Sequence, residues 1–157
     1  MNWNPHFRPF RHDNEVRFIG MGLLQRCLPQ PAWTHAAHLA AGVYLLRERQ
    51  DIDLRAQLPG IIQRYNLSVG TPNSDTEGYH HSITLLYIAA VEARVRRIKG
   101  NASLAETANA IINSPLGSSD FPLRFYSRGR LFSVKARHHW VEPDVTPLSL
   151  VPEMVGE

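Results

Sequence analysis

The chain has 157 residues, of which 43% are hydrophobic and 20% charged, and its formal net charge is +3 at pH 7. This length suits one domain with a full core and is short for two, and the composition is that of a globular protein rather than a disordered chain. No apolar run reaches the roughly 18 to 20 residues needed to cross a membrane, and the first residues lack the basic and then apolar pattern of a signal peptide. The single cysteine, Cys27, excludes a disulfide within the chain. We therefore expect a cytoplasmic protein without a membrane partner.

Basic residues are scattered along the chain, apart from the two stretches 94–99 and 124–137. A nucleic-acid-binding protein needs a basic face with aromatic or helical readout, and no such motif is present. We predict no nucleic-acid partner, and we interpret the first basic stretch as the end of a helix, where cations suit the negative pole. The unusual feature of the composition is its eight histidines.

The first half of the chain predicts an arm and two helices. Residues 1–14 are polar and aromatic and are expected to be extended. Residues 15–27 carry apolar side chains at helical spacing, which places Cys27 in the core. A proline-rich break follows, and a second helix is predicted over residues 32–49, because Pro31 stands just ahead of it where its missing amide is harmless. Apolar residues surround most of this helix, so we expect it to be deeply buried.

A third helix is predicted over residues 54–65. Either Asp51 or Asp53 can cap it, and Pro59 followed by a glycine can kink it. Residues 66–77 are polar and form a loop.

A fourth helix is expected over residues 78–98, and a fifth over residues 104–113, introduced by a Ser-x-x-Glu capping box. Residues 120–126 and 131–139 are candidates for short helices, and the proline-rich tail from residue 141 is expected to be extended. No stretch alternates between apolar and polar residues as a strand would.

The fold class predicted from these elements is all-α. We expect a compact single-domain bundle of about five to six helices over residues 15–140, with an N-terminal arm over 1–14 and an extended C-terminal tail over 141–157. The broad apolar surfaces of the second and fourth helices are compatible with one core or with a homodimer interface.

Two histidine-bearing stretches begin the second and fourth predicted helices. His35 and His38 are three residues apart and so share one helix face; His80 and His81 begin the other helix. Short connections favour antiparallel neighbours, so helices two, three and four should run up, down and up. The four imidazoles would then meet at one end of the bundle.

The chemistry predicted for this cluster follows from its position. A positive helix N-terminus disfavours a protonated imidazole, and a neutral imidazole can bind a transition metal or act as a base. The same helix ends attract anionic groups. We therefore consider His35, His38 and His80 as ligands of a divalent transition metal, zinc or iron, with a carboxylate supplied by one of four acidic residues: Asp75, Glu77, Glu142 or Asp144.

The metal interpretation has an alternative. The spacing matches neither the i, i+4 histidine pair of zinc proteases nor the Glu-x-x-His pairs of di-iron bundles. Buried histidines are more often satisfied by backbone and hydroxyl groups, and the nearby hydroxyl residues Thr34, Tyr79, Ser82 and Thr84 are placed to serve this purpose.

Several short motifs together resemble a family of small bacterial proteins without an established function. The pattern of that family is a W-T-H-x-x-H-L helix, a G/K-Y-H-E-T-I/V-T segment and a W-V-E-P-D tail, and the resemblance covers about residues 22–148. It implies functional roles for seven residues: His35, His38, Tyr79, His80, Thr84, Glu142 and Asp144. The chain departs from the pattern at His81 and Ser82, where glutamate and threonine are expected, so the role of His81 is in doubt.

Three functions are compatible with these observations. The first is a metal-assisted or histidine-based enzyme that acts on a small polar or anionic molecule. In it His80, Tyr79 and Thr84 would carry or orient the chemistry, and Glu142 or Asp144 would close the site. The second is a protein that binds a small ligand or a metal without turnover, as a regulator would. The third is an interaction protein in which the histidines form a structural network.

Overall fold

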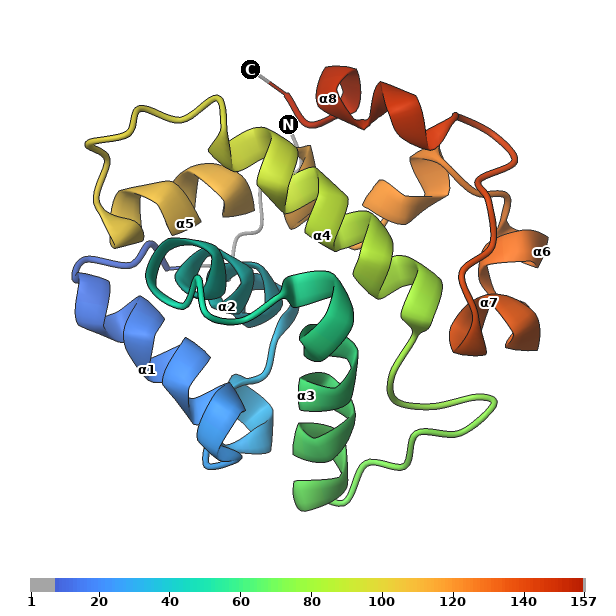
Figure 1. Cartoon of the computed structure of the whole chain (residues 1–157), viewed down its shortest axis with the longest axis horizontal. Helices are drawn as coiled ribbons and strands as arrows, with labels where there is room; N and C mark the ends of the chain where they lie inside the picture. The colour runs from blue at the N-terminus through green and yellow to red at the C-terminus, as the bar shows by residue number, and fades with distance from the viewer. Residues whose placement is uncertain (1–7, 157) are drawn as a thin grey trace.

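The computed structural model describes residues 8–156, and every regular element in this range is helical (Figure 1). The prediction of an all-α fold is therefore confirmed. The described residues contain eight α-helices, more than predicted, because three short helices follow the five longer ones. Their bounds are α1 Asp13–Gln25, α2 His35–Glu48, α3 Leu54–Ser68, α4 His81–Val95, α5 Leu104–Ile112, α6 Arg128–Leu131, α7 Val134–His138 and α8 Val151–Met154.

Helix α1 packs against α2 at unusually close range. A Cβ atom added to Gly20 would lie 2.0 Å from the Tyr44 ring, so only glycine allows this approach. The helix ends at Gln25, where Arg26 takes a left-handed conformation with a φ of 58°. This turn leaves Cys27 exposed, and the prediction that the cysteine lies in the core is wrong, because the helical spacing was extended past the end of the helix.

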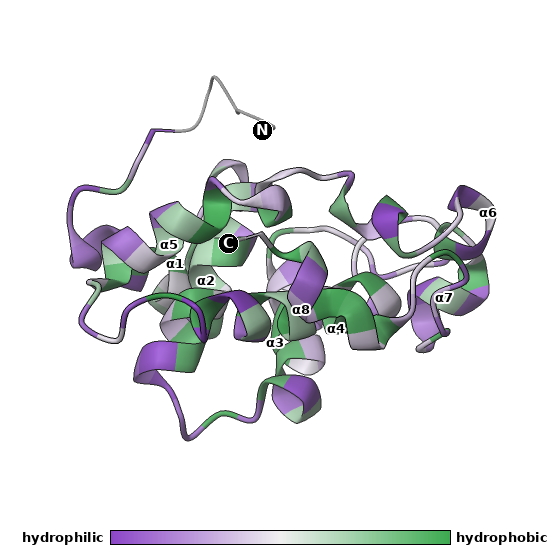
Figure 2. Ribbon diagram, turned by 90° about the horizontal axis from the view of Figure 1, so that it is seen from above, coloured by the Kyte–Doolittle hydropathy of each residue, from purple (hydrophilic) through white to green (hydrophobic). Residues whose placement is uncertain are grey.

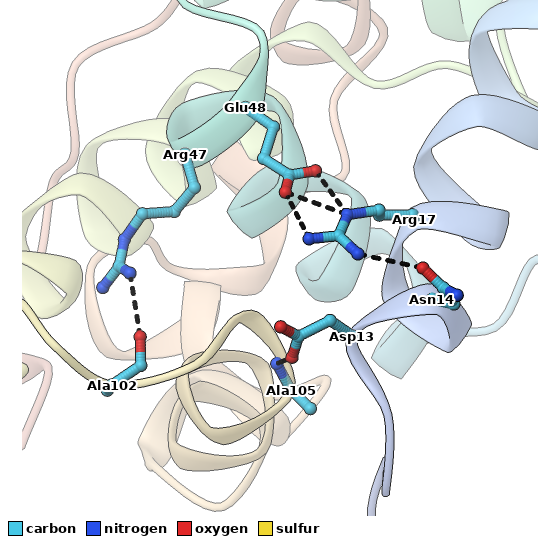
Figure 3. Close-up of polar contacts among 7 residues, drawn as sticks. All are labelled: Asp13, Asn14, Arg17, Arg47, Glu48, Ala102 and Ala105. Atoms are coloured by element: carbon cyan, nitrogen blue, oxygen red, sulfur yellow. Dashed lines mark hydrogen bonds and ion pairs between the residues drawn. The ribbon is translucent and has the colours of Figure 1, made fainter.

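Polar contacts tie α1, α2 and α5 together at one end of the fold (Figure 3). The guanidinium of Arg17 on α1 lies 2.7 Å from the Glu48 carboxylate on α2. Asp13 accepts a hydrogen bond of 2.9 Å from the backbone amide of Ala105 at the start of α5. These contacts fix α2, one wall of the cavity described below, against α1 and α5.

The caps of α3 and α5 form as the sequence predicts. Asp53 caps α3 by accepting from the amide of Ala56, and Ser103 forms the predicted capping box with Glu106 at α5. Helix α3 continues through Pro59 and ends three residues beyond the predicted boundary, at Ser68. It is therefore a single traverse, as the prediction for helices two, three and four assumes.

Helix α4 crosses the middle of the fold in Figure 1, and Figure 2 shows it as hydrophobic along much of its length. It contacts α2, α3, α5, α7 and α8. Burial on many sides explains why its sequence has little amphipathic pattern. None of the helices within residues 8–156 has both the length and the apolar character needed to traverse a lipid bilayer.

The C-terminal segment is not an extended tail, contrary to the sequence prediction. It forms α8, which packs on α4, with Val151 and Val155 buried. Arg97, just beyond α4, donates to the carbonyl of Gly156 at 2.8 Å. Proline at the second position of α8 is compatible with a helix start, and this is the feature that the interpretation of a proline-rich tail overlooked.

Candidate functional site

A cavity between α2, α3 and α4 lies where the two histidine stretches were predicted to meet. It has two adjoining compartments, of about 310 and 320 Å³, which share His38, Ile62, Ile83 and Thr84. Most of the residues that line the first compartment are aliphatic, and we call it the apolar compartment. It is lined by His35, His38, Leu39, Gly42, Leu54, Leu58, Ile62, Ile83, Thr84, Tyr87, Ile88 and Val91. The second is the polar compartment, lined by Gln30, Trp33, His38, Ile62, Asn66, Val69, Thr71, Gly78, Tyr79, His80, Ile83 and Thr84.

His38 stands at the junction of the two compartments. Its Nδ1 lies 2.6 Å from the carbonyl oxygen of Thr34, and because a carbonyl can only accept, Nδ1 carries the proton. The ring stacks on Trp33 with centroids 3.7 Å apart. The side chain keeps an exposed surface. Desolvation by the surrounding protein lowers the pKa of His38 to about 4, while the hydrogen bond to Thr34 acts in the opposite direction. His38 is therefore neutral at pH 7, with its lone pair on Nε2.

His35, the first residue of α2, also donates to a backbone carbonyl, but through its other ring nitrogen, Nε2. Its Nε2 donates to the carbonyl of Leu116 at 2.8 Å, so the lone pair of the neutral ring is on Nδ1. The edge of the ring faces Tyr87, at a centroid distance of 5.3 Å. The Tyr87 hydroxyl donates to the carbonyl of Ser118 at 3.2 Å, and burial, with Asp120 nearby, raises the pKa of this phenol. The phenol therefore stays protonated at neutral pH.

His80 has a structural role at the start of α4. It is the N-cap residue, and its Nδ1 accepts from the amide of Ile83 at 3.2 Å, while its Nε2 donates to the carbonyl of Leu131 at 2.8 Å. Burial lowers the pKa of this imidazole. Both ring nitrogens are occupied by backbone groups, so His80 has no lone pair left for a metal or a substrate.

A network centred on Asn73 holds the loop that carries Tyr79 and His80. The Asn73 side chain accepts from Asn66 at 3.0 Å and from the amide of Tyr79 at 3.1 Å, and it donates to the carbonyl of Gln63 at 3.0 Å. Gly78 has a φ of 81°, and an added Cβ atom would lie 2.1 Å from the carbonyl oxygen of Pro72. The loop is therefore fixed in a conformation that only glycine at this position permits.

Tyr79 and Thr84 both line the cavity, as the sequence predicted. The Thr84 hydroxyl donates to the carbonyl of His80 at 2.8 Å. The Tyr79 hydroxyl lies 2.7 Å from Nδ1 of His81, and burial raises the pKa of Tyr79 to about 12. His81 lines neither compartment; it faces a separate surface hollow beside Arg55 and Trp140. The four imidazoles therefore do not all meet, because the start of α4 directs His80 and His81 to different sides.

The two tail carboxylates lie outside the cavity, so the prediction that Glu142 or Asp144 closes the site is wrong. Asp144 accepts from the amide and the hydroxyl of Ser127 at the start of α6, at 2.8 and 2.6 Å. Glu142 accepts from the indole of Trp140 at 2.9 Å. Glu142 is thus held within its own segment, and Asp144 by the start of α6.

The predicted metal centre is not supported by the geometry. Within residues 8–156 no group of three or more His, Cys, Asp or Glu side chains could hold a metal ion. Of the three expected ligands, His80 is fully occupied by backbone groups, and no carboxylate lines either compartment. The two remaining lone pairs, on His35 and His38, would not complete a zinc or iron shell by themselves.

The sequence did not single out Tyr87, which lines the apolar compartment, or the backbone carbonyl groups that accept hydrogen bonds from the histidines. Tyr87 lies two helical turns from His80, so continuing the face of α4 that begins with Ile83 and Thr84 could have found it. The carbonyls of Leu116 and Leu131 have no sequence signal, since any residue supplies a carbonyl.

Comparison with known protein families, with characterised proteins and with solved structures finds no significant match to this chain. The resemblance to a bacterial family stays a prediction.

Proposed function

We propose that this protein binds a small, mostly apolar and uncharged organic molecule in the cavity between α2, α3 and α4. The observation that carries the proposal is the apolar compartment, a space of about 310 Å³ walled by Leu, Ile and Val side chains from three helices. Small-molecule sites are typically concave, mainly apolar and of this size, with a few polar groups for orientation.

The charge of the walls favours an uncharged ligand. Neither compartment is lined by Lys, Arg, Asp or Glu, and His38 is neutral at pH 7. An ion that entered the apolar compartment would lose its hydration without meeting an opposite charge. This differs from the anionic substrate that the helix termini suggested from the sequence.

Binding without turnover is favoured over histidine-based catalysis. A general base works best when its pKa lies near the working pH, whereas the pKa of His38 is about 4. His80 has no free nitrogen. His38 and His80 are therefore suited to structural or orienting roles rather than to proton transfer.

A pair of substitutions at Gly42 tests the proposal. A Cβ atom at this position would meet only Val91, at 3.9 Å, across the apolar compartment. Gly42→Leu therefore places a side chain in the space, while Gly42→Ala leaves the space nearly unchanged. Both replace a glycine within α2, so both variants should unfold no more easily than the wild type, with a gain of up to about 1 kcal/mol for alanine.

The readout is the fluorescence of N-phenyl-1-naphthylamine, an uncharged probe that brightens in apolar surroundings. We expect saturable binding to the wild type and to Gly42→Ala, and binding weakened more than about tenfold in Gly42→Leu, because the leucine side chain overlaps the ligand. Absence of binding to the wild type, or equal binding to both variants, would contradict the proposal.

A further inference from the structure

The polar side chains of the apolar compartment share one property. They are His35, His38, Thr84 and Tyr87. In its uncharged form, each of these side chains has a single proton to donate. In each case that proton is given to a backbone carbonyl, belonging to Leu116, Thr34, His80 and Ser118 respectively. What these side chains can offer to a ligand is lone pairs.

We infer that the apolar compartment selects a ligand that brings its own hydrogen-bond donor, a hydroxyl or N–H group on an otherwise apolar body. This inference rests on the proposed function and names the class of molecule that the cavity takes. His38 is the principal acceptor, because its Nε2 has no hydrogen-bond partner among the described residues and the ring stands at the junction of the two compartments.

The selection follows because an unpaired buried polar group costs more free energy than a hydrogen bond contributes. A ligand hydroxyl placed at Nε2 of His38 makes a hydrogen bond and leaves no polar atom unsatisfied. An ether or carbonyl oxygen at the same place meets another lone pair, and a carboxylate adds the cost of a buried charge. Mismatches of this kind usually cost more than the hydrogen bond itself contributes.

The tautomers that produce this selection are fixed from outside the cavity. The Thr34 carbonyl lies one turn before His38 on its own helix, whereas Leu116 and Ser118 lie on the segment after α5. Neither ring of His35 and His38 can exchange its donor and acceptor nitrogens without losing a bond of 2.8 Å or shorter. The acceptor character is therefore a property of the folded protein rather than an adjustment to the ligand.

Three probes that share one ring system test the inference by isothermal titration calorimetry at pH 7.5. They are 2-naphthol, which has a donor; 2-methoxynaphthalene, in which a methyl group replaces that donor; and 2-naphthoate, an anion. We expect 2-naphthol to bind roughly tenfold more tightly than 2-methoxynaphthalene, and 2-naphthoate to bind most weakly. His38→Phe, which keeps an aromatic ring against Trp33, should reduce the difference between the first two probes to less than about threefold. His139→Phe, at an exposed histidine outside both compartments, should leave it unchanged.

The possible failures are distinguishable. If 2-naphthol and 2-methoxynaphthalene bind the wild type equally well, or if the difference persists in a folded His38→Phe variant, the donor requirement is wrong while the proposed binding function stands. Should His38→Phe unfold, the comparison of the three probes on the wild type decides alone. If none of the probes binds, both the proposed function and this inference are overturned.

Discussion

The histidines that line the cavity and His138, the last residue of α7, have different hydrogen-bond partners. His35, His38 and His80 each donate to a backbone carbonyl, whereas His138 lies 2.7 Å from the carboxylate of Asp75 on the surface. A carbonyl fixes one tautomer and brings no net charge, while a carboxylate stabilises the imidazolium. The partner therefore differs between the two sites: an uncharged backbone carbonyl in the cavity and a side-chain carboxylate on the surface.

We expect the largest effect on the free energy of unfolding from a substitution in the loop that precedes α4 and positions His80. Gly78→Ala should lower the free energy of unfolding by about 3 kcal/mol or more, because a left-handed alanine costs about 1 to 2 kcal/mol and the collision with the Pro72 carbonyl adds a similar amount. Urea denaturation measures the loss. Gly70→Ala is the matched control, since Gly70 has the same φ of 81° with nothing within 4 Å of an added Cβ atom. Equal losses in the two variants would show that the loop is not packed as described.

A smaller effect on stability should distinguish His80, which is bound to backbone groups, from His138, which is bound to a carboxylate. His80 is 8% exposed and holds two backbone groups, so His80→Ala should cost about 2 to 4 kcal/mol of unfolding free energy through a lost cap, an unsatisfied carbonyl and lost packing. His138→Ala removes an exposed contact with the Asp75 carboxylate and should cost less than about 1 kcal/mol. Thermal and urea unfolding of both variants test this, and a loss at His138 as large as that at His80 would contradict the comparison.

The sequence predicts the helices well and the site only in part. Caps at Asp53 and Ser103, and the shared face of His35, His38 and Gly42, follow from local rules and are present in the structure. His38 and His80, which the sequence places near the starts of two helices, both line the polar compartment. The caps and the shared helix face depend on residues that are close in sequence.

What the sequence could not predict depends on the backbone of distant segments. The carbonyl of Leu116 lies 81 positions after His35, and the carbonyl of Leu131 lies 51 after His80. No residue type marks a carbonyl that will face an imidazole. The carboxylates of Glu142 and Asp144 suggested metal ligands by their chemistry, but in the structure they accept hydrogen bonds from Trp140 and from Ser127. A histidine pattern alone therefore indicates a site without indicating which nitrogens are free.

Acidification should affect the stability of the protein in a direction set by His38. Its pKa of about 4 in the folded protein lies below the value of about 6.5 for a free imidazole, so the unfolded chain binds the proton first. The contribution of His38 to stability is therefore fully present above about pH 6.5 and is lost as the pH falls toward 4.

The measurement that tests the central claim most directly is the pH titration of His38 by ¹H–¹⁵N NMR correlation, which reports both the tautomer and the pKa. The account predicts a neutral ring with its proton on Nδ1 at pH 7 and a pKa of about 4. A ring that carries its proton on Nε2, or that titrates between about pH 6 and 7 like a free imidazole, would contradict it, because the cavity would then present a donor or a charge where a lone pair is required.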